Sequence, residues 1–257
     1  MDDKKSENHE KDPGYIPGIY NYCDRWCERC RFTARCRTYA MEEEEKDSGD
    51  AVDVFSDLFW EKITETLQST MNLIEEIARE EGIDLDAVES GDSDDESDVV
   101  HILSGISEAY IDRVDGWFES NAPLIENGLR NHNNHPHLKL VHPEESEAPI
   151  SLKDAVQVVR WYAHPIHVKL SRALRSKDSE KKLEFDDFSK DSDGSAKVAL
   201  IGMDRSISAW GELLNYFKSR RKQILEIIRY LKRIRDIAEK EFPNARAFIR
   251  PGFDEVE

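Results

Sequence analysis

The sequence predicts an all-α fold, an up-and-down bundle of about five helices with an N-terminal cysteine-rich loop that binds metal. Two observations lead to this fold class. Apolar residues recur at steps of three and four through most of the chain, as in amphipathic helices, whereas the alternation typical of strands is scarce. Hydrophobic residues make up 39% of the 257 residues, which is enough to build a substantial core.

The first two helices are predicted over about 52–81 and 99–119. The first ends at Gly82, because glycine readily adopts the left-handed backbone that closes many helices. The second is closed by Pro123 and the polar loop that follows it. The acidic stretch 84–98 separates the two helices and is predicted to be a solvated linker.

The third helix is predicted to begin near Ser151, which is a suitable N-cap with Asp154 three residues later. Its apolar stripe continues to about residue 174. Pro165 lies inside this helix, where it removes one backbone hydrogen bond and crowds the preceding turn. A kink is therefore predicted near 161–164.

The fourth helix, about 195–217, follows the polar linker 177–194. The fifth, 221–242, has the clearest apolar stripe and stops at Pro243. Because consecutive helices with one apolar face bury those faces against each other, an up-and-down bundle over 52–250 is the simplest arrangement.

The remaining boundaries follow from composition. Residues 1–14 are predicted to be disordered, 15–40 to form the cysteine loop, 41–51 to be an acidic linker, and 251–257 to be a tail. The formal net charge of −18 is concentrated in the linkers, with eight acids and no base in 84–98 alone. The acidity of the chain therefore indicates no cationic partner.

The sequence predicts a cytoplasmic protein without a membrane partner. No apolar run approaches the roughly 20 residues that a membrane helix needs, and the N-terminus lacks the apolar core of a secretory signal. A reducing compartment also keeps cysteine thiols available for metal.

All four cysteines of the chain, Cys23, Cys27, Cys30 and Cys36, lie in one stretch with the spacing C-x3-C-x2-C-x5-C. Such a cluster is typical of one metal site, because thiolate selects zinc or iron–sulfur clusters. The absence of a long interval between two pairs favours a [4Fe–4S] cluster, with zinc as the alternative and disulfides as a third. Arginines outnumber acids around the cysteines, which suits a negatively charged cluster.

The run Cys27-x2-Cys30-x5-Cys36 resembles the cluster loop of endonuclease III-type DNA glycosylases, which bind one [4Fe–4S] cluster through C-x6-C-x2-C-x5-C. The resemblance implies the cluster type and these three ligands, to which proximity adds Cys23. It does not imply glycosylase activity, because the first interval differs and no helix-hairpin-helix stretch is present. Cys23-x3-Cys27-x2-Cys30 is also the spacing of radical S-adenosylmethionine enzymes, but Cys36 fills the position that those enzymes leave open, and the helical pattern leaves no room for their barrel.

Histidines supply a weaker second candidate. His164 and His167 are three residues apart, so a helix places both on one face beside Pro165, as a second metal site requires. The Glu-x-x-His motif of di-iron bundles is missing from the chain. A further group lies in a polar stretch that is expected to be an exposed loop: His132, His135, His137 and His142.

Charged residues beside apolar helix faces are expected to form ion pairs between helices rather than a catalytic pair. They are Asp112, Asp115, Asp204 and Arg205. Residues 218–250 hold eleven bases and four acids, yet nucleic acid is an unfavoured partner because the acidic linkers compete for them and interleaved aromatic residues are missing.

The sequence thus predicts a helical protein that holds one metal centre and acts as a redox, sensing or structural module, with an unidentified protein partner. A zinc-stapled interaction protein is the first alternative. The second is a metal-dependent enzyme with a site around the third helix, where Trp161, Tyr162, His164 and His167 would line a cavity. No catalytic residue is identified, and enzyme activity is left open.

Overall fold

A computed structural model defines the structure of the chain. It describes residues 14–47, 64, 68–73, 76, 79, 98–132, 151–183 and 191–254. Every regular element in these residues is helical and none is a strand, so the predicted all-α class is confirmed. The chain divides into two compact units, the first formed by Met1–Cys36 with Ser97–Glu257 and the second by Arg37–Glu96.

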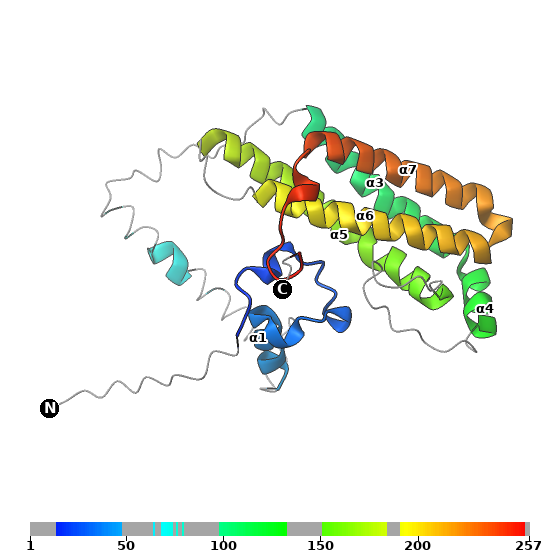
Figure 1. The fold of residues 1–257 in the computed structure, drawn as a ribbon, viewed down its shortest axis with the longest axis horizontal. Coiled ribbons are helices and arrows are strands. Elements are labelled where there is room, and N and C mark those ends of the chain that lie inside the picture. Colours follow the sequence, from blue (N-terminus) through cyan, green and yellow to red (C-terminus); the bar gives the residue numbers. More distant parts are fainter. Residues whose placement is uncertain are drawn as a thin grey trace. The chain divides into compact units, whose positions relative to one another are not determined.

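Four long helices dominate the described part of the first unit (Figure 1): α3 (Asp98–Ser120), α5 (Leu152–Leu183), α6 (Asp191–Tyr216) and α7 (Arg221–Glu241). Helix α5 packs against α3 and α6, and α7 packs against the other sides of α6 and α3. The four helices therefore enclose one shared core.

Neighbouring helices of this bundle run in opposite directions. Arg172 of α5 pairs with Asp191 at the start of α6, whereas Tyr162, further back on α5, contacts Arg205, further along α6. Figure 1 shows the same alternation around the whole bundle. These four helices alternate in direction, whereas the predicted bundle had about five helices. The predicted helix 52–81 belongs to the second unit, and most of its residues lie outside the described part of the chain.

The core is one continuous apolar cluster with aromatic residues at its centre. The indole Nε1 of Trp210 on α6 donates a hydrogen bond to the hydroxyl of Tyr110 on α3 at 3.2 Å. The ring of Trp117 packs edge-on against Trp210, with centroids 5.0 Å apart. Burial raises the pKa of Tyr110 to about 12, so its hydroxyl stays protonated at neutral pH.

Helix α5 begins as predicted and is longer than predicted. The backbone N–H of Asp154 donates to Oγ of Ser151 at 3.1 Å, which confirms Ser151 as the N-cap. The helix continues through Pro165 to Leu183. Because proline has no N–H, one carbonyl in the preceding turn, where Trp161 lies, lacks its helical partner.

Two stretches that were predicted as loops are helical. After Pro123, where a polar loop was predicted, the chain forms α4 (Ala122–His132). Proline in the first turn of a helix loses no hydrogen bond and supplies a suitable φ, so Pro123 belongs to the start of this helix rather than to the end of the one before. In the second unit, α1 (Arg37–Asp47) includes residues of the stretch 41–51 that was predicted as an acidic linker.

The predicted linker 177–194 is helical at both ends. Helix α5 covers its first seven residues and α6 its last four. Two acceptors join the end of α5 to the start of α6. Asp191 accepts hydrogen bonds from Arg172 and Ser176, and Glu180 accepts them from the backbone and hydroxyl of Ser192. These contacts explain why the described ends of a charged, polar stretch are helical.

The helices α5 and α6 approach closely at Gly202. A Cβ added there would lie 2.9 Å from Cδ1 of Tyr162 and 3.2 Å from Cγ1 of Ile166. Gly202→Ala is therefore expected to lower the free energy of unfolding by about 1–2 kcal/mol, because Tyr162 must move. Gly211, on the same helix, has nothing within 4 Å of an added Cβ. Gly211→Ala is expected to be stabilising by up to about 1 kcal/mol. Urea unfolding of both variants measures these changes. If both variants changed the free energy of unfolding in the same direction, the close packing at Gly202 would be contradicted.

Candidate metal centre

The cysteines lie in residues 14–36, called here the cysteine segment, which belongs to the same unit as the bundle. The segment is a series of short 3₁₀ turns: η1 (Ile19–Tyr22), η2 (Cys27–Arg29) and η3 (Thr33–Arg35). Cys23, Cys30 and Cys36 each follow the end of a turn directly, and Cys27 begins one. The spacing of the cysteines is therefore the spacing of the turns.

Besides Gly14 at its first position, two left-handed residues bend the segment near the cysteines. Gly18, with φ of 73°, precedes η1, and Arg25, with φ of 59°, lies between Cys23 and Cys27. Glycine adopts this conformation without strain, whereas arginine does so at a modest cost. The bend at Arg25 also turns its backbone N–H toward the thiol of Cys23, to which it is hydrogen-bonded.

All four cysteines are half-buried and none forms a disulfide. Burial raises the pKa of the Cys23 thiol, and the hydrogen bond from Arg25 acts in the opposite direction. Burial likewise raises the pKa of the Cys30 thiol, whose sulfur accepts the backbone N–H of Phe32 at 3.4 Å. Backbone N–H groups directed at sulfur are a common support for thiolate ligands.

The thiols are near one another without meeting at one point. The charges of Cys23 and Cys36 contribute to the raised pKa of Cys30, so these groups lie within electrostatic range. Within the described residues, however, no three Cys, His, Asp or Glu side chains are grouped so that they could hold a metal ion. The structure thus gathers the predicted ligands in one segment but does not arrange them around a common centre.

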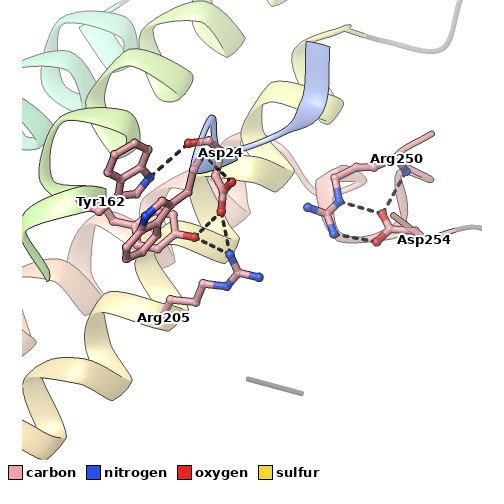
Figure 2. Close-up of polar contacts among 7 residues, drawn as sticks. Asp24, Tyr162, Arg205, Arg250 and Asp254 are labelled. Atoms are coloured by element: carbon pink, nitrogen blue, oxygen red, sulfur yellow. Dashed lines mark hydrogen bonds and ion pairs between the residues drawn. The ribbon is translucent and has the colours of Figure 1, made fainter. Parts of the chain in front are cut away.

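Asp24, next to Cys23, is the main anchor of the segment on the bundle (Figure 2). Its carboxylate accepts hydrogen bonds from the hydroxyl of Tyr162 on α5 and from Nη1 of Arg205 on α6, the latter at 2.8 Å. Its backbone oxygen accepts one from the indole of Trp161 at 3.2 Å. Burial, together with the Asp24 charge, raises the pKa of Tyr162 well above its ordinary value. The hydroxyl therefore remains a donor.

The next anchor lies just before Cys27. The ring of Trp26 stacks on Trp161, with centroids 4.9 Å apart, and also touches the edge of Tyr162. The guanidinium of Arg29 lies over the ring of Trp26, 4.1 Å from its centroid. The same group forms an ion pair with Asp154 at 3.0 Å. Residues between the cysteines thus bind α5, so the cysteines cannot move far without disturbing the bundle surface.

Lys169 on α5 is a contact that the sequence did not reveal. Its Nζ donates to the backbone oxygen of Asn21 at 3.0 Å. Burial lowers the pKa of Lys169, and the charge of Cys23 opposes this effect, which places the ammonium group within electrostatic range of that thiol. A half-buried cation beside a cysteine favours its thiolate form.

Residues 245–254, called here the C-terminal segment, also pack against the cysteine segment. Phe253 meets the ring of Phe32 edge-on, at 5.1 Å between centroids, and Phe248 contacts Tyr22 at 4.7 Å. Gly252 has φ of 73°, and a Cβ added there would lie only 2.8 Å from Cδ1 of Ile16, so a side chain would clash at this position. The stretch 251–257 was predicted to be a tail, but its described residues, 251–254, are part of this packing.

Asp254 fastens the C-terminal segment. It pairs with Arg250 at 2.8 Å and with Lys197 at 2.7 Å. Burial alone would raise the pKa of this carboxyl, but hydrogen bonds from Arg250 and Lys197 outweigh it and hold the pKa well below its ordinary value. The folded state therefore binds this proton less readily than the unfolded state, and the stabilisation is present above about pH 4 and lost as the pH falls below it.

The expected result is a pH-dependent difference between the parent protein and Asp254→Asn. The variant is expected to be less stable at pH 7. The difference in the free energy of unfolding is expected to shrink as the pH falls below about 4, because there the carboxyl of the unfolded parent takes up a proton while that of the folded parent stays ionised. Urea unfolding at several pH values measures this difference. Asp115→Asn, at an exposed position of α3, is the control and is expected to show little difference at any pH. If the stability difference between the parent and Asp254→Asn did not change with pH, the lowered pKa of Asp254 in the folded state would be contradicted.

Within the described residues, His164 and His167 are not grouped with a third side chain that could hold a metal ion. His164 is exposed, whereas Nδ1 of His167 lies 2.8 Å from the hydroxyl of Ser107 on α3. Trp161 and Tyr162 contact the cysteine segment instead, so the four residues predicted to line an enzyme cavity are not brought together. Of the four histidines predicted to lie in an exposed loop, His132 is instead the last residue of α4, and His135, His137 and His142 lie outside the described residues.

The predicted ion pairs between elements are confirmed for two of the four charged residues. Asp204 of α6 pairs with Arg235 of α7 at 3.0 Å and with Arg246 at 2.8 Å. Arg205 pairs with Asp24. The other two, Asp112 and Asp115, are exposed.

No protein family, curated protein or solved structure matches this chain. In the part of the chain that the structure describes, no helix has both the length and the apolar character needed to cross a bilayer. The side chains and their contacts are therefore the basis for assigning a function.

Proposed function

We propose that the cysteine segment binds one [4Fe–4S] cluster through Cys23, Cys27, Cys30 and Cys36, and that the protein is a cytoplasmic redox, sensing or structural module. The observation that carries the proposal is the set of four cysteines without disulfides on a single segment docked to a bundle, with backbone N–H groups directed at two of the sulfurs. Thiols that are not joined in disulfides are available to bind metal in a reducing compartment.

Charge favours a cluster over zinc. A cluster held by four thiolates carries net negative charge, which nearby cations and sulfur-directed hydrogen bonds offset. The segment offers such cations, since Lys169 lies beside it and four arginines occur within it: Arg25, Arg29, Arg31 and Arg35. The short intervals between cysteines support the same choice.

Binding requires the sulfur atoms to turn toward a common centre. Because Asp24, Trp26 and Arg29 lie between the cysteines and bind the bundle, we expect this movement to be limited to the turns that carry Cys30 and Cys36. A bound cluster would supply redox chemistry or a structural crosslink there. The side chains of this chain would hold it, exclude water and transmit its presence to α5 and α6.

Anaerobic reconstitution tests the proposal. The purified chain is incubated with ferrous iron and sulfide in one sample and with zinc in another, and visible absorption and bound metal are measured after desalting. Broad visible absorption with about four iron and four sulfide per chain is the expected result. If the chain bound one zinc and took up no iron stably, the proposed cluster would be wrong and the segment would hold a structural zinc ion instead. If it bound neither metal, the proposal of a metal centre would be contradicted.

A further inference from the structure

A cleft of about 400 Å³ lies between α6 and the C-terminal segment. Its wall contains four cationic side chains and two carboxylates: Lys197, Arg205, Arg246, Arg250, Asp204 and Asp254. The volume is within the range of small-ligand sites and well above that of a single ion. The cleft is therefore large enough for a small molecule that carries more than one charged group.

The charges of the cleft are not balanced within it. Asp254 is already shared by Arg250 and Lys197, and Asp204 is shared by Arg246 and by Arg235 outside the cleft. Two further carboxylates, which do not line the cleft, also pair with its arginines: Asp24 pairs with Arg205, and Glu239 pairs with Arg246. The lining itself therefore contains more cations than carboxylates, and the carboxylates that complete the pairing lie outside it, although the chain as a whole carries a formal charge of −18.

The geometry of two arginines points to an anion between them. Figure 2 shows the guanidinium groups of Arg205 and Arg250 turned toward each other across a gap, and both line the cleft. Arg250 binds Asp254 through Nε and Nη2, and its guanidinium lies 4.9 Å from the centroid of the Phe253 ring. Like charges that face each other repel, so an oxyanion placed between them would be stabilised by both.

The helix α6 contributes its own polar face to the cleft. Lys197 and Arg205 lie on the turns of α6 that line it, and the hydroxyl of Ser208 lies one turn beyond. Arginine forks match the paired oxygens of a phosphoryl group, and a lysine and a hydroxyl add further donors. A ligand with one carboxylate would leave most of these donors unused.

We propose that this cleft binds a small molecule carrying phosphoryl groups. The proposal does not rest on the metal centre, because the cleft is built by α6 and the C-terminal segment and needs no cysteine. The ion pairs within the lining have a second role. The pairs Lys197–Asp254 and Arg246–Asp204 fasten the C-terminal segment to α6, and Arg205 holds the cysteine segment through Asp24.

Calorimetric titration with inorganic pyrophosphate at low ionic strength tests the proposal. One site per chain is expected, with affinity that falls as salt is added. Arg250→Gln and Arg246→Gln are each expected to weaken binding about tenfold or more, because a charged donor to the anion is lost. Arg246 is the more exposed of the two, so its variant keeps the test valid if Arg250→Gln disturbs the C-terminal segment.

Arg233→Gln is the matched control, since Arg233 is exposed on α7 and lies outside the lining. It removes the same charge and is expected to leave pyrophosphate affinity within about twofold of the parent value. Absence of binding, or equal weakening by Arg233→Gln, would overturn the proposal. Adenosine diphosphate in a parallel titration distinguishes the source of the phosphoryl group: tighter binding than pyrophosphate indicates an organic phosphate, and weaker binding indicates an inorganic one.

Discussion

Cys30→Ser is expected to lower the iron bound by the protein at least about tenfold. A serine hydroxyl is a poor ligand for iron in a cluster, because it is harder than thiolate and is protonated at neutral pH. The backbone N–H of Phe32, which donates to the Cys30 sulfur at 3.4 Å, would also lose its acceptor. Iron and sulfide analysis after anaerobic purification measures the loss.

Ala34→Ser is the matched control for this variant. It introduces the same side chain at an exposed position of η3, between Cys30 and Cys36, without removing a thiol. Its iron content is expected to equal that of the parent protein. Full iron and sulfide in Cys30→Ser, or an equal loss in both variants, would show that Cys30 is not a ligand.

Asp24→Ala is expected to lower the free energy of unfolding by about 2–3 kcal/mol and to release the cysteine segment from the bundle. The side chains of Asp24 and Arg205 are only 23% and 18% exposed, so removal of the carboxylate leaves a half-buried guanidinium without its ion-pair partner. The hydroxyl of Tyr162 loses its acceptor as well. Urea unfolding measures the first effect and limited proteolysis within the segment the second.

Asp112→Ala removes a carboxylate from an exposed position of α3 and serves as the control, with an expected change of less than about 0.5 kcal/mol. A double-mutant cycle with Tyr162→Phe adds a sharper test. The two changes are expected to be non-additive, because both remove the same hydrogen bond. Strict additivity, or equal stability of Asp24→Ala and Asp112→Ala, would contradict the anchoring role of Asp24.

The four long helices could be predicted because each has an apolar stripe at helical spacing, and the buried residues of α7 fall on that stripe. Helix α4 could not be predicted in the same way. Pro123 is equally compatible with the end of one helix and the first turn of the next, and the structure places it in the first turn. Local sequence does not decide between the two.

The helical ends of the stretch 177–194 were missed for a different reason. Its composition is that of a linker, and its helical ends are held by contacts such as that between Arg172 and Asp191. A contact of this kind becomes visible only when α5 and α6 are packed together. Composition alone therefore overestimated the length of the linker.

The cysteines were found from spacing, but the residues that hold them in place were not. Asp24 binds Tyr162 and Arg205, which are 138 and 181 residues away in the chain. The sequence singled out Trp161 and Tyr162 only as residues that would line an enzyme cavity around the helix with an internal proline. One usable signal was Trp26, a large aromatic residue between two cysteines, which needs an apolar surface and finds it on Trp161.

The most direct test of the metal centre is the metal and sulfide content of the protein as isolated. The full chain is purified without oxygen, and iron, acid-labile sulfide and zinc are measured on one sample. The account predicts about four iron and four sulfide per chain with little zinc. About one zinc without sulfide would contradict the cluster and make the cysteine segment a zinc staple, and the lack of either metal would contradict the metal centre itself.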